Sequence, residues 1–226
     1  QEKTFRRKIT DNPAEPAGYY ELACLYLQSS DPEKALQVLE QTDRLPKARP
    51  GEESPAIWVA VHRAYYNAYC ALGDARAKID SKKADDWYAK ARTCATTPEE
   101  FIRLAQKIST CRLANKDADG AAREWRTLLN DFPDFICAFE DGAMETGLQA
   151  LLRLSEILGD GDNAAEAVKY CQMIIERYWD RDVLGQKAQA HAFQTVRKIT
   201  QFHPLAYEAC ENEAGKLLDA AQKNND

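Results

Sequence analysis

The sequence has little of what most catalytic and metal sites are built from. It contains three histidines, His62, His191 and His203, and none of them has a second histidine or a cysteine at metal-ligand spacing. There is no Gly-x-Ser-x-Gly turn, and no glycine-rich loop ends in Gly-Lys-Ser or Gly-Lys-Thr. We therefore expect no metal, no cofactor and no catalytic residue.

Long apolar runs and an excess of positive charge are also missing. The longest apolar segment, residues 148–158, is interrupted by Gln149, Arg153 and Glu156, whereas a membrane-spanning helix needs about 20 apolar residues. The 36 acidic residues outnumber the 30 basic ones, which gives a net charge of −6. Nucleic-acid-binding domains carry the opposite balance. We expect neither a membrane span nor a nucleic-acid partner.

Paired cysteine motifs are absent as well. The seven cysteines occur singly, and their odd number and expected mid-helix positions favour reduced thiols packed as small core side chains. A disulfide between Cys94 and Cys111, on neighbouring helices, is left open. The chain begins with Gln1, which indicates a processed or trimmed product. The compartment is therefore left open between the cytoplasm and a periplasmic or secreted location.

What the sequence does contain is a recurring pair of amphipathic helices. Tyr19, Leu22-Ala23 and Tyr26 fall on one helical face, and a second helix opens at Asp31-Pro32 and presents the small residue Ala35. This layout resembles the 34-residue helix–turn–helix unit of the tetratricopeptide repeat (TPR) family. The resemblance implies an all-α, right-handed solenoid of stacked antiparallel helix pairs that binds protein or peptide partners.

The pattern predicts a single TPR-like domain over residues 1–226. Its expected parts are the end of a preceding repeat or a cap (1–13), repeats at 16–44, 56–94 and 98–133, a bridging segment with the fourth repeat (134–180), and a capping helix pair (182–223). An insertion near residues 75–81 either extends a helix or forms a charged loop.

Two local expectations follow from this stacking. Ala35, Ala121 and Ala167 stand where helices cross, so they are expected to be buried. No strand signal is recognised, and the aromatic segment between Phe132 and Phe139 is expected to form a short bridging helix.

The resemblance also implies a binding groove, because in TPR proteins the first helices of the pairs line a concave surface that receives a peptide. Transferring these positions predicts the groove residues Tyr20, Arg63, Tyr66, Asn67, Gln106 and Thr110, with Leu152 and Glu156 from the fourth repeat. For Tyr66 both core packing and surface contact are open, with surface contact slightly favoured. Several Lys, Arg and Asn residues clamp a terminal carboxylate in some TPR domains, and that set is missing here.

The expected function is a non-catalytic scaffold that holds a partner peptide. Two alternatives are an envelope or periplasmic assembly factor of TPR type, and a carbohydrate or small-molecule site made by Trp58, Tyr66 and Tyr69. Residues 115–120 imitate the start of a calcium loop. The twelfth position, which should be a bidentate Glu, is Arg126, so a helix-to-helix turn is favoured.

Overall fold

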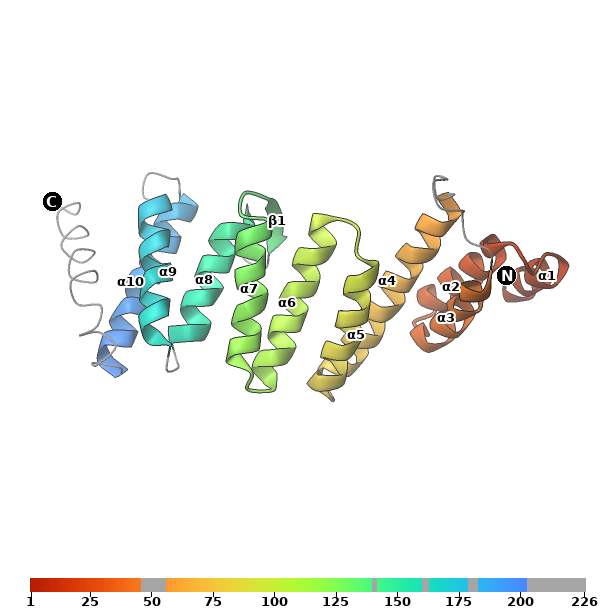
Figure 1. The fold of residues 1–226 in the computed structure, drawn as a ribbon, viewed down its shortest axis with the longest axis horizontal. Coiled ribbons are helices and arrows are strands. Elements are labelled where there is room, and N and C mark those ends of the chain that lie inside the picture. The colour runs from red at the N-terminus through yellow and green to blue at the C-terminus, as the bar shows by residue number, and fades with distance from the viewer. Residues whose placement is uncertain (46–55, 140–141, 160–162, 179–182, 203–226) are drawn as a thin grey trace. The chain divides into compact units, whose positions relative to one another are not determined.

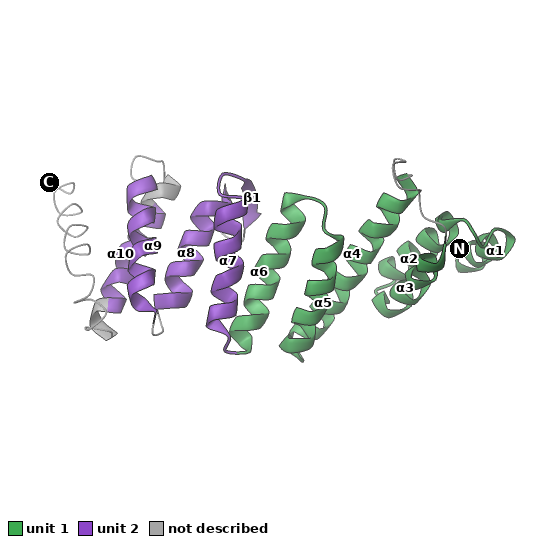
Figure 2. Ribbon diagram, viewed as in Figure 1, with its two compact units in different colours: residues 1–115 green, residues 116–226 purple. Residues whose placement is uncertain are grey.

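A computed structural model describes residues 1–45, 56–139, 142–159, 163–178 and 183–202. These described residues form ten α-helices, one short 3-10 helix and one two-stranded hairpin (Figure 1). They fall into two compact units, residues 1–115 and residues 116–226 (Figure 2). The prediction of an all-α fold of stacked helix pairs is confirmed, while the assignment of the whole chain to one domain stays a prediction.

Unit 1 begins with α1 (Glu2–Asp11) and continues with two helix pairs and one further helix. These are the pair α2 (Pro16–Gln28) and α3 (Pro32–Leu39), the pair α4 (Ala56–Ala77) and α5 (Ser81–Cys94), and α6 (Pro98–Ala114); η1 (Glu40–Arg44) extends α3. Each helix packs on its neighbour in sequence, and α2 also packs on α4. The first helices of the first two pairs therefore lie against one another.

Side-chain caps explain where several of these helices start. Asp31 accepts a hydrogen bond from the backbone N–H of Lys34, and Asp80 does the same for Lys83, each at 3.1 Å. Prolines occupy the first position of α2, α3 and α6, where a helix needs no N–H donor. The turn chemistry seen in the sequence thus fixes the pairing of the helices locally.

The insertion in the second repeat lengthens the helix α4, which runs unbroken to Ala77. Just before the inserted residues, Gly73 and Asp74 both contact Tyr88 on α5. A Cβ on Gly73 would lie 2.3 Å from Cε1 of Tyr88, and the Tyr88 hydroxyl donates a 2.7 Å hydrogen bond to Asp74. Because Gly73 has no side chain, the Tyr88 ring lies directly against α4. This glycine therefore has a packing role inside the helix.

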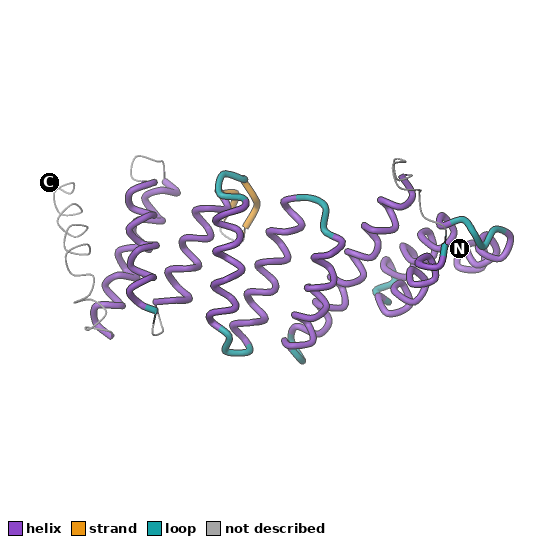
Figure 3. Tube along the Cα trace, in the orientation of Figure 1, coloured by secondary structure: helices purple, strands orange, loops and turns teal. Residues whose placement is uncertain are grey.

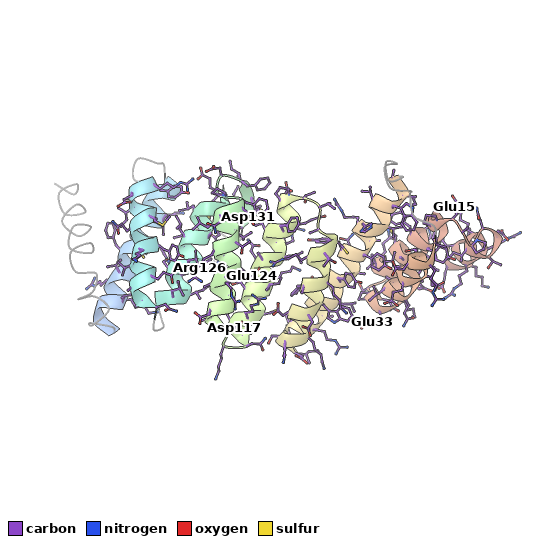
Figure 4. All side chains as sticks on the ribbon, viewed as in Figure 1. Glu15, Glu33, Asp117, Glu124, Arg126 and Asp131 are labelled. Carbon is purple, nitrogen blue, oxygen red and sulfur yellow. The ribbon has the colours of Figure 1, made fainter. Side chains whose placement is uncertain are left out.

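Unit 2 contains α7 (Ala118–Asp131), a hairpin of β1 (Ile136–Phe139) and β2 (Gly142–Glu145), and then α8 (Thr146–Gly159), α9 (Ala164–Tyr178) and α10 (Val183–Phe202). The helices α7, α8, α9 and α10 pack in that order, and α10 also packs on α8. Figure 4 labels Asp117 and Asp131 at the two ends of α7, with Arg126 between them. The Arg126 guanidinium donates to both carboxylate oxygens of Glu166 on α9 at 2.9 Å.

The prediction of a bridging helix near Phe139 is wrong, because this segment forms the hairpin (Figure 3). Ile136 pairs with Glu145 and Phe139 with Gly142 in antiparallel register. Pro133 lies two residues after the end of α7 at Asp131 and disfavours a continued helix, and the branched and aromatic residues after it suit a strand. The hairpin is anchored to α8, since the N–H and hydroxyl of Thr146 both donate to the Phe135 carbonyl at 2.8 Å.

The expected close packing of small side chains is confirmed. Ala35, Ala121 and Ala167 are each 0% exposed. Cys94 and Cys111 are free thiols in one apolar cluster, so the disulfide left open by the sequence is not formed. Burial raises the pKa of the Cys171 thiol to about 12, as expected for a cysteine used for packing.

Some sequence predictions lie outside the described residues. These are most of the loop 45–55, residues 160–162 of the turn after α8, and the second capping helix, 204–223. Across the described ranges, no helix combines the length and the apolar character needed to cross a bilayer.

Candidate functional site

The predicted groove residues of unit 1 lie on the first helices α2, α4 and α6. Arg63 and Asn67 are exposed on α4, and Thr110 is exposed on α6. Tyr20 on α2 and Gln106 on α6 are half-buried, and the Tyr20 ring packs against the apolar core. We call Arg63, Asn67, Gln106 and Thr110 the first-helix face.

An ion pair joins the two helices of this face. Nε of Arg63 lies 3.0 Å from Oε1 of Glu100, at the start of α6. The other carboxylate oxygen of Glu100 accepts hydrogen bonds from the N–H groups of Thr96 at 2.8 Å and Thr97 at 3.2 Å. Glu100 therefore caps α6 and also holds Arg63, whose side chain stays 53% exposed. Arg63 is thus positioned on the surface rather than free to sample many conformations.

Tyr66 does not belong to this surface, and the slight preference for surface contact is wrong. The residue is 5% exposed and packs in a cluster with Tyr88 of α5 and with Leu104 and Ile108 of α6. This burial raises the pKa of its phenol well above the usual value. The sequence could not distinguish core packing from surface contact for Tyr66. A helix that packs on two neighbours buries two adjoining faces, and only the folded structure shows that α6 as well as α5 packs on this side of α4.

The three aromatic residues considered for a carbohydrate site do not form one. Trp58 and Tyr66 are 9% and 5% exposed and belong to two different clusters. Tyr69 stacks on Tyr65 and on Trp87, with ring centroids 5.8 and 6.0 Å apart. The Tyr69 ring is covered by other rings and the Trp58 and Tyr66 side chains are buried, so this hypothesis is wrong in its residues.

Unit 2 contains a groove between α8 and α10. It consists of two adjoining cavities of about 260 and 370 Å³, which share Glu156 and His191. The predicted residues Leu152 and Glu156 both line it. We call these two cavities together the α8–α10 groove. Its further lining residues are Met144, Leu148, Gln149, Arg153, Gly159, Lys187, Ala188, Gln194, Thr195, Lys198 and Ile199.

Charged side chains meet at the point that the two cavities share. Arg153 donates from Nη1 to Oε2 of Glu156 at 3.0 Å, and Nε2 of His191 lies 3.5 Å from Oε1 of the same carboxylate. The sequence missed Arg153, Lys187 and His191 as groove residues. Lys187 and His191 were missed because α10 was assigned to the cap, and a cap was not expected to supply a binding surface.

The segment that imitates a calcium loop is used for capping. Oδ1 of Asp117 accepts a 2.8 Å hydrogen bond from the N–H of Gly120 at the start of α7. Among the residues that the structure describes, no three His, Cys, Asp or Glu side chains gather in a way that would hold a metal ion. The arrangement at both surfaces is suited to contact with another molecule through hydrogen bonds, charge and apolar area.

Comparison with known proteins identifies one repeat directly. Residues 149–178, which span most of α8 and all of α9, match the tetratricopeptide repeat family model. No curated protein matches the chain.

Three solved structures match most of the chain at low identity and with TM-scores below 0.5. MamA is 15% identical, with 89% of this chain and 90% of that chain covered and a TM-score of 0.43. YrrB, described as a TPR protein with an unusual peptide-binding site, is 16% identical, with 93% and 100% covered and a TM-score of 0.43. The kinesin light chain TPR-like repeats of Podosopora anserina are 15% identical, with 94% and 95% covered and a TM-score of 0.46.

Proposed function

We propose that this chain, a helical-repeat protein of the tetratricopeptide type, is a non-catalytic scaffold that holds a segment of a partner protein against its first helices. The repeat type is given by residues 149–178 together with the stacked helix pairs. Stacked repeats present a long surface made of many helices, and such a surface suits an extended or helical segment better than a compact substrate.

The observation that carries this proposal is the exposed polar first-helix face. Asn67 and Thr110 lie exposed on α4 and α6, and Glu100 at the start of α6 holds the exposed Arg63 of α4. Arg63, Asn67 and Thr110 include no carboxylate, imidazole or thiol that could act as a general acid or base. They can instead supply hydrogen bonds and one charge to a peptide laid across the helices.

Peptide display tests the proposal. A random peptide library is panned on the immobilised full chain, and enriched peptides are measured by fluorescence anisotropy. The double variant Asn67→Arg with Thr110→Arg places two bulky cations on the face. We expect it to weaken binding of peptides that occupy this face by about tenfold or more, the loss typical of an interface centre.

A matched variant controls for added charge. Ala89 and Thr93 are exposed on α5, the second helix of the pair α4 and α5 in the same unit, so Ala89→Arg with Thr93→Arg introduces the same groups on a helix that does not carry the face. Peptide affinity should be unchanged in this variant. Failure of the library to yield any sequence-related binder would overturn the scaffold proposal, and equal losses in both variants would count against the first-helix face.

A further inference from the structure

We propose that the α8–α10 groove binds an extended peptide of about five residues that carries an acidic side chain close to a bulky apolar one. This inference rests on the proposed scaffold function and adds a location and a ligand chemistry to it. It is carried by three features of the groove: its charge, a buried amide without a partner, and its length.

The charge of the groove is opposite to that of the protein. The chain has a net charge of −6, yet the described residues that line the groove include Arg153, Lys187 and Lys198 and only one carboxylate, that of Glu156. Both oxygens of Glu156 face cationic or protonatable partners. Lys187 is exposed and has no carboxylate partner among the described residues. A carboxylate on the ligand complements this local excess of positive charge.

The buried amide is Gln149. This residue is 3% exposed, lines the groove, and its Oε1 has no hydrogen-bond partner among the described residues. Leaving a buried polar group unpaired is costly, so such a group is usually satisfied by a ligand or by water. An extended peptide main chain offers both N–H and C=O groups, and it can therefore satisfy the amide in either orientation of the Gln149 side chain.

The remaining lining near Gln149 is apolar. Met144, Leu148 and Ala188 are 6%, 4% and 3% exposed and surround the same cavity. Lys187 precedes Ala188 in sequence and borders this cavity too. An apolar ligand side chain in the cavity and a carboxylate at Lys187 must therefore be only one or two ligand residues apart.

The length of the groove sets the size of the ligand. Its lining on α8 runs from Leu148 to Gly159, a helical distance of about 16 Å at roughly 1.5 Å per residue. An extended chain advances about 3.3 Å per residue, so about five ligand residues fit. A single amino acid or a small acid would fill only one of the two cavities.

A peptide array on the full chain tests this chemistry. The probes are immobilised heptapeptides with a fixed central leucine and with aspartate, asparagine or lysine placed in turn at each other position. We expect aspartate one or two positions from the leucine to bind about tenfold more tightly than asparagine at the same position. In the variant Lys187→Glu the preference should reverse toward lysine, whereas Lys169→Glu on the exposed side of α9 should leave it unchanged.

A second variant separates ligand binding from folding. In Gln149→Leu the apolar lining is kept and the buried amide is removed, so we expect about tenfold weaker peptide binding with a melting temperature that is unchanged or higher. A lower melting temperature with unchanged binding would mean that Gln149 has a structural role only, and it would overturn its part in the site.

Other outcomes identify which proposal has failed. Peptides that bind equally with aspartate and asparagine, and that are insensitive to Lys187→Glu, would overturn the acidic ligand while leaving the scaffold function in place. The absence of binding by every peptide of this array would overturn the ligand proposed for the groove, and failure of the random library as well would overturn the scaffold function. Competition by free N-acetylaspartate at the peptide's own concentration would show a small-acid site and overturn the five-residue ligand.

Discussion

At the scale of single residues, Glu100 shows how one side chain connects local structure with the candidate surface. Its Oε2 accepts the N–H groups of Thr96 and Thr97, and its Oε1 holds Arg63 of α4. Thr97 completes the reciprocal cap by accepting the N–H of Glu100 at 3.3 Å. The cap therefore sets both the start of α6 and the position of Arg63 on the first-helix face.

Removing the Thr97 hydroxyl should destabilise the protein. We expect Thr97→Ala to lower the free energy of unfolding by about 1 kcal/mol, because the N–H of Glu100 loses its partner. Urea unfolding followed by circular dichroism measures this. The matched variant Thr127→Ala changes an exposed residue inside α7, where alanine is the better helix former, and it should not lower stability. A similar loss in both variants would contradict the capping role.

At the scale of elements, the close contact between α4 and α5 depends on one residue without a side chain. Gly73 lies inside α4, and the Tyr88 ring occupies the space where its Cβ would be. The same ring is tied to Asp74 by its hydroxyl. The contact between α4 and α5 is thus specific to one glycine, one aromatic ring and one carboxylate.

A methyl group at Gly73 should push these helices apart. We expect Gly73→Ala to lower the free energy of unfolding by about 2 kcal/mol, which is within the usual range for overpacking, although alanine has the better helix propensity. Differential scanning calorimetry would record the lower melting temperature. At Gly159 the nearest atom to an added Cβ is 3.4 Å away on Thr195, so Gly159→Ala should be neutral or stabilising. Equal effects at the two glycines would be inconsistent with the contact described.

The helices and the hairpin also show which elements could be predicted from the sequence. Helix periodicity, caps and prolines are local signals, and they predicted the helix pairs from α2 and α3 to α8 and α9. The hairpin was missed because four-residue strands carry too short a pattern to compete with an aromatic helix face. Tyr66 was misjudged because its environment depends on α5 and α6, which approach α4 only in the folded protein.

At the scale of the whole molecule, packing within each unit is between near neighbours. The helix contacts in unit 2 join α7 with α8, α8 with α9, α9 with α10 and α8 with α10. In such repeat proteins stability is close to a sum of repeat and neighbour terms, so a local change spreads only a short way.

Overpacking one helix of unit 2 should therefore loosen that unit alone. Ala167 is 0% exposed on α9, and we expect Ala167→Leu to speed amide hydrogen exchange in α8, α9 and α10 by about tenfold. Exchange in α2 to α5 should be unchanged in the same mass-spectrometric experiment. Ala190→Leu, at an exposed position of α10, is the control without effect. Faster exchange throughout unit 1 would refute neighbour-limited stability.

The sequence alone determined the repeating helix pairs, their main turns and the burial of the small crossing residues, because these depend on signals within about one repeat. Only the tertiary structure decided which faces stay open. It buried Tyr66, paired residues 136–139 with 142–145 as two strands, and placed Lys187 and His191 of α10 in one groove with Glu156 of α8. Surfaces between helices are set by the distance of closest approach, and that distance depends on side chains far apart in the chain.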